Sequence, residues 1–129
     1  MSAAHTGYPE GAVPAIATLV LPDVANLHGG AFGGWITGQC DLAAGILGRR
    51  HGGACVTKSV QEMVFHAVLQ VGDAFMIHGA IVREGRTSMT IELTGWRESE
   101  AGLREAVVTA RFVMVCIDEQ GRPRALGRN

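Results

Sequence analysis

The residue best suited to chemistry in this chain is Asp41, an aspartate in the middle of a predicted helix. Aspartate is unfavourable there because its short carboxylate competes for backbone donors. Four glycines lie at helical spacing on the same stripe, and each glycine inside a helix costs about 0.5–1 kcal/mol relative to alanine. We expect this face to leave room beside a carboxylate that can accept a proton. These glycines are Gly34, Gly38, Gly45 and Gly48.

A glycine-dense loop leads into this helix, with Gly33 and Gly34 where the helix begins. The first N–H groups of a helix have no partner inside it, and together with the helix dipole they suit an oxygen that gains negative charge. A tight turn with positive φ would also select glycine. The two interpretations are compatible.

Composition and charge limit the class of protein. The 129 residues predict a single domain with one sizeable core, and the net charge of −1 gives no nucleic-acid footprint. No apolar run approaches the roughly 20 residues of a membrane span, and no secretory signal is visible. The odd number of cysteines, without CxxC spacing, indicates reduced, buried thiols in a cytoplasmic protein. They are Cys40, Cys55 and Cys116.

The elements that must position Asp41 follow from the hydrophobic pattern. A short strand and a loop come first, then the long helix, then four strands joined by turns. The expected ranges are 15–21 for the first strand, 22–32 for the loop, 33 to about 50 for the helix, and 54–66, 74–84, 88–96 and 105–117 for the later strands.

The connections between the later strands are too short for a crossover helix, so the sheet should be largely antiparallel. One long helix packed across one curved antiparallel sheet is the layout of the hotdog fold, in the α+β class. Two details follow from the strand patterns: Val56, Val60 and Val64 should share one face, and the strand 74–84 should be buried on both faces. We expect a flexible arm at 1–13, a single domain at 14–118 and a tail at 119–129.

Several segments, taken together and in order, resemble the hotdog-fold acyl-CoA thioesterases of the YciA type, relatives of the animal brain acyl-CoA hydrolases. They are LPDVANLHGGAFGGWITGQCDLAAGI, CVTKSVQEMVFHAVLQVGD, GRTSMTIEL and DEQGRPRAL, spread over residues 17–126. The combination is specific, although each segment alone would be weak. The resemblance implies an enzyme that hydrolyses acyl-CoA thioesters without a metal or redox cofactor. It also implies sites built across a homodimer, commonly assembled as a trimer of dimers.

Two residues match the catalytic pair of that family, Asn26 and Asp41. Asp41 would act as a general base on water, or as a nucleophile through a mixed anhydride, and the sequence leaves both open. Its structural alternative is an ion pair with Lys58 or an arginine. The amide of Asn26 can orient the water or the thioester, whereas without the resemblance an Asx-turn would be the simpler interpretation.

This chain departs from the family pattern at three positions near the pair. Val24 stands where an acidic residue is usual, Gly30 where a polar residue is usual, and Cys40 where methionine is usual. These changes bear on the hydrogen bonds of the loop and on acyl preference. Cys40 itself should pack in the core, because the next helix position points about 100° away from Asp41.

The residues expected to contact CoA carry basic or hydroxyl groups, or lie in a glycine turn beside them. A GRTS turn between two strands can hold a phosphate or the pantetheine arm, although the same letters make an ordinary hairpin corner. Basic residues of the tail can be solvated instead. The candidates are Lys58, Gly85, Arg86, Thr87, Ser88, Arg122 and Arg124.

Two other functions remain open from the residues. A hotdog hydratase–dehydratase would couple a histidine with a carboxylate across the dimer, and His28 lies close to Asn26 in sequence. A non-catalytic acyl-CoA-binding module would bind without turnover. No histidines have the spacing of metal ligands on a helix. The helix aspartate favours the hydrolase.

Overall fold

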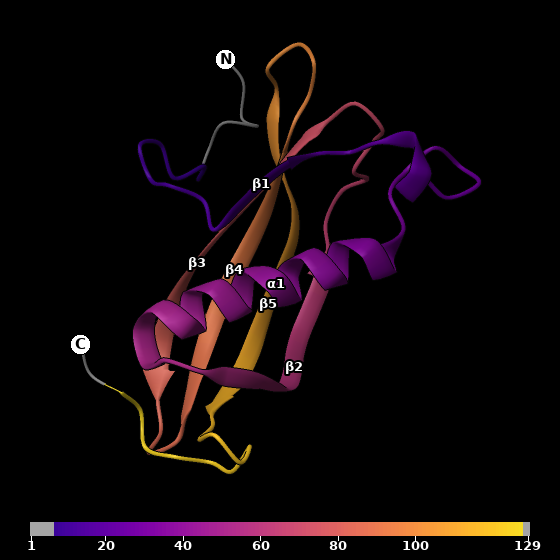
Figure 1. Ribbon diagram of the computed structural model, residues 1–129. Coiled ribbons are helices and arrows are strands. Elements are labelled where there is room, and N and C mark those ends of the chain that lie inside the picture. The colour runs from indigo at the N-terminus through magenta and orange to yellow at the C-terminus, as the bar shows by residue number, and fades with distance from the viewer. Residues whose placement is uncertain (1–6, 128–129) are drawn as a thin grey trace.

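A single long helix lies across one face of a five-stranded antiparallel sheet in the computed structural model, which describes residues 7–127 (Figure 1). The strand order is β1-β3-β4-β5-β2, and all neighbours are antiparallel. This arrangement confirms the predicted α+β hotdog layout. The elements are β1 (Ile16–Leu19), the 3-10 turn η2 (Pro22–Val24), α1 (Gly33–Gly52), β2 (Cys55–Phe65), β3 (Ala74–Glu84), β4 (Ser88–Glu98) and β5 (Arg104–Cys116).

The helix α1 begins after Phe32, which has extended backbone angles, and ends at Gly53, whose φ is +87°. An L side chain rarely adopts that angle, so glycine ends the helix at little cost. The last carbonyls are closed by the tail, because Nη2 of Arg124 donates to the oxygens of Gly52 and Ala54 at 3.0 and 3.1 Å. The helix therefore extends two residues beyond the predicted end.

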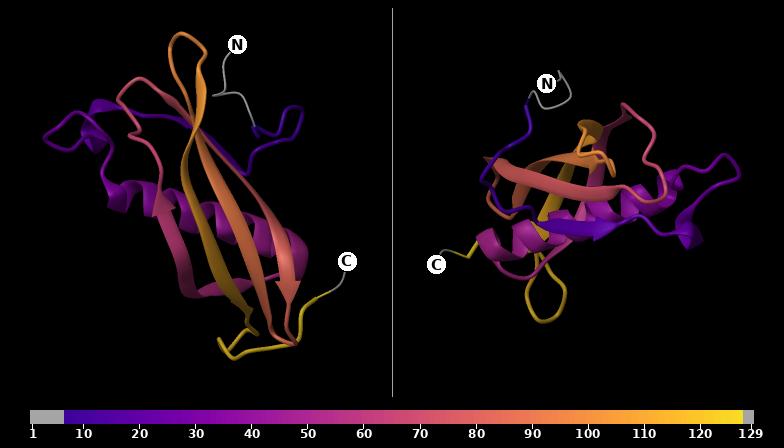
Figure 2. Two further views of the ribbon diagram at one scale, coloured as in Figure 1. Left: turned by 180° about the vertical axis from the view of Figure 1, so that it is seen from behind. Right: turned by 90° about the horizontal axis from the view of Figure 1, so that it is seen from above.

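The buried face of α1 carries small side chains. Figure 2 shows from above how the helix lies against the sheet. Cys40, Ala43 and Ala44 are fully buried. Trp35 packs against Phe75 with ring centroids 5.9 Å apart, whereas Phe32 is half-exposed. The sheet side of this core consists of Phe75, Ile77, Met89, Ile91, Leu93, Phe112 and Met114.

The predicted faces of β2 are wrong, because two bulges interrupt its alternation. Its pairing with β5 shifts register between Thr57 and Ser59 and again between Gln61 and Val64. Each bulge adds a residue to one strand and so reverses the facing of the residues after it. Val60 consequently lies opposite the core residue Phe112, and the other two valines lie on the far face.

The prediction for β3 is correct in its bounds and only half correct in its burial. The segment Phe75–Ile77 is buried, whereas most residues from Gly79 to Glu84 are exposed. The short strand β1 pairs only with the first part of β3, from Ala74 to Ile77. Beyond that point β3 has no neighbour on this side within the described residues.

Part of the expected N-terminal arm is attached to the sheet on the side away from α1. The Tyr8 ring packs edge-on against His78 and Trp96, with centroids 5.3 Å apart in both pairs. Arg104 lies 4.3 Å above the same ring and forms an ion pair with Glu10 at 2.5 Å. Residues 7–13 of the expected arm thus include side chains in contact with the sheet, while residues 1–6 lie outside the described part.

A buried ion pair fixes the turn between β2 and β3. Asp73 is 4% exposed, and its carboxylate accepts two hydrogen bonds from Arg97, at 2.8 and 3.1 Å. The same carboxylate accepts the N–H of Gln70 at 2.8 Å, and Glu105 accepts a third bond from the guanidinium at 3.2 Å. The hydrogen bond with Asp73 raises the pKa of Arg97.

Between residues 7 and 127, no helix is long and apolar enough to cross a membrane.

Candidate active site

Asp41 projects from α1 toward β2, where it meets a hydroxyl. Oγ1 of Thr57 donates a hydrogen bond of 2.5 Å to Oδ1 of Asp41. The same hydroxyl lies 3.4 Å from the sulfur of Met114 on β5. Among the described residues, Asp41 forms no ion pair with Lys58 or an arginine, which were its structural alternatives. The sequence did not indicate Thr57 as a site residue, because only the packing of β2 against α1 brings it opposite the aspartate.

The predicted open space beside Asp41 is present for three of the four glycines. A Cβ added at Gly34, Gly38 or Gly45 would meet no atom within 4 Å. Gly48 is different, since its Cβ would lie 2.9 Å from Sγ of Cys55. The missing side chain of Gly48 lets side chains of the sheet pack against the helix. The prediction that Gly48 provides space for another molecule is therefore wrong.

An apolar groove of about 510 Å³ opens beside the carboxylate of Asp41 between α1 and β2. A second hollow of about 450 Å³ shares part of this lining and continues past Arg49 to the end of the helix. An apolar groove with one carboxylate can hold an apolar group next to a base. The first groove is lined by Asp41, Leu42, Gly45, Ile46, Arg49, Cys55, Val56, Thr57 and Met114.

Asn26 forms the Asx-turn that the loop alone suggested. Its Oδ1 accepts the N–H groups of His28 and Gly30 at 2.8 and 3.2 Å. Its Nδ2 has no hydrogen-bond acceptor among the contacts of residues 7–127 and remains a donor. One chain does not bring Asn26 to Asp41: Asn26 is absent from the groove lining, and the helix rises about 12 Å between its first residue and the aspartate.

The loop glycines have clear structural reasons. A Cβ at Gly30 would lie 2.8 Å from Cγ1 of Val68, which explains the absence of a larger side chain there. Gly33 and Gly34 do not have positive φ, so the tight-turn interpretation is wrong for them. They are exposed at the start of α1, and the first described helical bond of this turn runs from the N–H of Ile36 to the oxygen of Phe32. Their N–H groups point ahead of the helix.

The GRTS turn is held as a hairpin corner and also lies beside a pocket. The N–H of Gly85 donates to the oxygen of Ser88 at 2.8 Å, and the oxygens of Thr87 and Arg86 accept from the end of β5 and from the tail. Thr87 lies with Lys58 on a pocket of about 360 Å³. Gly85 and Ser88 line a different hollow of about 280 Å³ beside Gln61 and Arg83.

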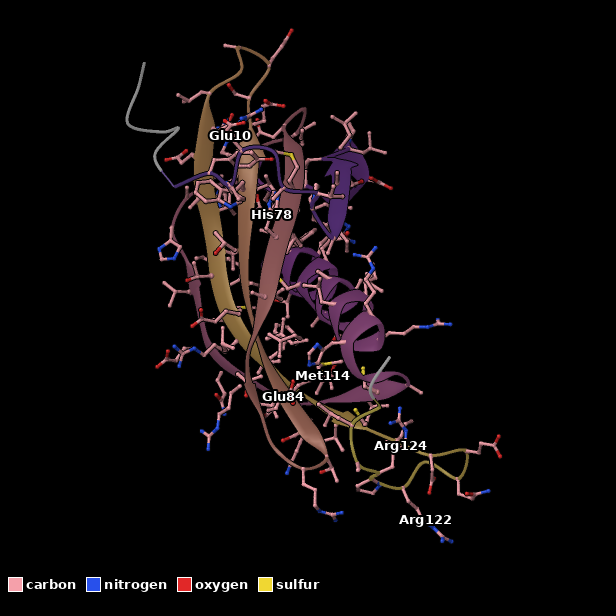
Figure 3. All side chains as sticks on the ribbon, turned by 90° about the vertical axis from the view of Figure 1, so that its left-hand side faces the viewer. Glu10, His78, Glu84, Met114, Arg122 and Arg124 are labelled. Carbon is pink, nitrogen blue, oxygen red and sulfur yellow. The ribbon has the colours of Figure 1, made fainter. Side chains whose placement is uncertain are left out.

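The two tail arginines differ in their contacts (Figure 3). The guanidinium of Arg124 donates to four backbone oxygens, those of Gly52, Ala54, Ile117 and Ala125. It therefore joins the tail to the end of α1, and few of its donors remain for a ligand. Arg122 lies in the turn that follows β5, and its side chain extends away from the helix.

Cys40 belongs to the core and is not a nucleophile. The side chain is fully buried, and burial raises its pKa from 9.0 to about 11. Because the folded thiol keeps its proton where the unfolded thiol loses it, the free energy of unfolding should fall as pH rises from about 9 to about 11. We expect a loss of about 2–3 kcal/mol over that window, measured by urea unfolding, and a smaller loss in Cys40→Ala. An equal loss in both proteins would contradict this assignment.

No group of three or more His, Cys, Asp or Glu side chains within residues 7–127 could hold a metal ion. His28 is exposed and lies outside the groove lining. Asp41 lines the groove and is hydrogen-bonded there to a neighbouring side chain, that of Thr57.

Comparison with known proteins agrees with this geometry. The sequence profile of the thioesterase superfamily matches residues 28–103. The acyl-CoA thioester hydrolase YciA of Escherichia coli is 34% identical over an alignment of 131 positions that covers 98% of each chain. An uncharacterized acyl-CoA thioester hydrolase of Zymomonas mobilis is 41% identical over 112 residues, covering 85% of this chain and 75% of its own.

Solved structures give the same result for the fold. The hexameric thioesterase from Yersinia pestis is 30% identical with a TM-score of 0.86, over 92% of this chain and 98% of that one. A hexameric broad specificity acyl-coenzyme A thioesterase is 34% identical with a TM-score of 0.87, over 91% and 88%. The chain therefore belongs to the thioesterase superfamily and has its hotdog fold.

Proposed function

We propose that this acyl-CoA thioester hydrolase uses Asp41 as the general base that deprotonates the attacking water. The observation that carries the proposal is the hydrogen-bonded Asp41 at the wall of an apolar groove. The groove would hold the acyl chain, and the carboxylate would take a proton from water beside the thioester carbonyl. The products are a free fatty acid and CoA, so CoA enters as part of the substrate and no further cofactor is needed.

Thr57 is the positioning residue in this scheme. Its hydroxyl donates to Oδ1 of Asp41, which fixes the carboxylate in one orientation and leaves Oδ2 for the water. The N–H groups of Gly33 and Gly34 would stabilise the oxyanion at the positive end of the helix dipole. Asn26 would orient the water or the thioester with its remaining Nδ2 donor.

A second copy of the chain is needed to bring these groups together, since one chain leaves Asn26 away from the groove. The edge strand β2 has an unpaired side and exposes Val60 and Phe65, while α1 exposes Leu42. An apolar edge strand is a template for pairing with another chain. The solved relatives are hexamers, and we propose a homodimer that assembles into a trimer of dimers.

The CoA moiety would bind where hydroxyl and basic groups meet at the GRTS corner. Lys58 and Thr87 line one pocket there, which suits a phosphate, and Arg86 and Arg122 are close in sequence to its walls. We assign Arg124 mainly to the fold because of its four backbone contacts.

We place the enzyme in the cytoplasm, and its three free thiols support this.

Replacement of Thr57 by valine should lower kcat for acyl-CoA hydrolysis by roughly tenfold, because the shape is kept and the hydrogen bond to Asp41 is lost. Hydrolysis is followed with a thiol reagent over acyl-CoAs of increasing length. Thr57→Ser is the matched control, since it keeps the hydroxyl and should retain most of the rate. A Thr57→Val enzyme as fast as the serine variant would show that the hydroxyl has no part in the reaction, and a wild type without thiol release would overturn the function itself.

A further inference from the structure

Two cysteines occupy directly opposite positions at the start of β2 and the end of β5. Cys55 pairs with Cys116, and the next pair outward is bonded from the N–H of Ile117 to the oxygen of Ala54 at 3.0 Å. Cys55 and Cys116 are therefore the non-hydrogen-bonded pair, in which the Cα atoms approach to about 4.5 Å. That separation lies within the range of about 4.4–6.8 Å that a disulfide bridges.

Both sulfurs also lie on the same face of the sheet, under the last turns of α1. A Cβ at Gly48 would lie 2.9 Å from Sγ of Cys55, and a Cβ at Gly52 would lie 3.0 Å from Sγ of Cys116. The two glycines thus leave the space that the thiols occupy. Burial and then the negative charge of a Cys116 thiolate raise the pKa of Cys55, as expected for two close thiols.

The three cysteines differ in access. Cys40 and Cys116 are fully buried, whereas Cys55 is partly exposed and lines both the groove at Asp41 and the hollow beyond it. A small oxidant that enters the groove meets the Cys55 sulfur first. Cys116 lies behind it as the resolving thiol.

We propose that Cys55 and Cys116 form a reversible disulfide under peroxide and that this bond lowers activity at the adjacent groove. The thiol of Cys55 reacts with hydrogen peroxide to give a sulfenic acid and one water. The thiol of Cys116 then attacks that sulfur, forms the S–S bond and releases a second water. A dithiol reductant reverses the reaction and restores both thiols.

The bond affects the groove because Cys55 is one of its walls. Thr57, two residues along β2, holds the carboxylate of Asp41. A disulfide draws the two Cβ atoms to about 3.8 Å, closer than the roughly 4.5–5.5 Å of an ordinary cross-strand pair. The start of β2 consequently shifts toward β5 and moves Thr57 relative to Asp41.

The test treats the folded, full-length enzyme with hydrogen peroxide and follows free thiols, peptide mass under non-reducing conditions, and hydrolysis. In wild type and in the matched control Cys40→Ser, we expect the loss of two thiols within one chain and a linked peptide pair containing residues 55 and 116. We also expect kcat/KM to fall by roughly tenfold, with recovery in dithiothreitol. Cys55→Ser should keep its treated-to-untreated activity ratio near unity, and neither Cys55→Ser nor Cys116→Ser should yield the linked peptide pair.

Three results would overturn the proposal. One is a Cys55 oxidised to sulfinic acid while Cys116 remains a thiol, and another is a disulfide found only between chains. The third is a wild-type enzyme that carries the internal disulfide and hydrolyses acyl-CoA at its full rate, which removes the link to the groove. Thiol counts and peptide masses do not depend on the catalytic role of Asp41, so this proposal and the proposed function fail separately.

Discussion

Asp41→Asn should lower kcat for acyl-CoA hydrolysis by about 10²–10⁴-fold, because the amide keeps the shape of the side chain and cannot take a proton from water. The hydroxyl of Thr57 still has an oxygen to donate to, so the local structure should be retained. The measurement is thiol release from acyl-CoAs of several lengths, with KM changing much less than kcat. Asp41→Asn with wild-type kcat would exclude this residue as base and as nucleophile.

Isotope labelling detects the nucleophilic role of Asp41 if water opens the anhydride at the Asp41 carbonyl. A single turnover in ¹⁸O-water puts the label in the released fatty acid when Asp41 activates water. When Asp41 attacks the thioester and water then opens the mixed anhydride at the Asp41 carbonyl, the acid leaves with an oxygen of the carboxylate and the label is left on the enzyme. The proposed base mechanism requires labelled acid in the first turnover. Label on the enzyme would show instead that Asp41 attacks the thioester and forms the anhydride.

Subunit mixing tests whether Asn26 acts from the second chain. Asn26→Ala and Asp41→Asn should each be nearly inactive as homodimers. If the two residues meet only across subunits, a mixed dimer has one site with both intact residues, so co-expression should recover activity. If both residues of a site came from one chain, each site of the mixed dimer would lack one of the two residues. Co-expression would then recover no activity.

The fold was readable from the sequence because its signals are local. Glycine and proline at the ends of elements, together with the apolar runs, gave the bounds of β3 correctly and those of α1 to within two residues. The face pattern of β2 was not readable, since its bulges arise from pairing with β5, which is about 50 residues away. Glu62, the non-glycine residue with positive φ among the described positions, marks the second bulge, and nothing in its type indicates that angle.

The site divides in the same way between local and long-range signals. Asp41 was found because glycine and aspartate in a helix are locally unfavourable, and such local costs tend to mark function. Thr57 was not found, because its contact with the aspartate depends on how β2 lies beside α1. The charge of Arg124 predicts a CoA contact or a solvated tail residue, whereas its backbone partners at the end of the helix depend on how the tail folds back onto α1.

Asp73→Asn should lower the free energy of unfolding by about 3–5 kcal/mol, which is the cost of removing one partner of a buried ion pair, because Arg97 keeps only the partly exposed Glu105. Asp73 and Arg97 are both largely buried, and the carboxylate accepts three hydrogen bonds that fix the turn before β3. The ion pair lies at the far end of the sheet from Thr57, so the effect should be on stability. Urea unfolding with an unchanged slope measures it, and a loss below about 1 kcal/mol would mean that the pair is screened.

A double-mutant cycle shows whether the loss comes from the pair or from each side chain alone. In Arg97→Met the carboxylate of Asp73 keeps the N–H of Gln70 and loses the guanidinium, so that variant should be destabilised to a similar extent. In the double variant Asp73→Asn/Arg97→Met no charge is left unpaired in the core, and the total loss should be well below the sum of the two. Glu105, which is 44% exposed, has water as an alternative partner, so Glu105→Gln is the matched control and should cost less than about 1 kcal/mol. Additive single losses would instead show that the two side chains stabilise the protein independently, through packing rather than through their contact.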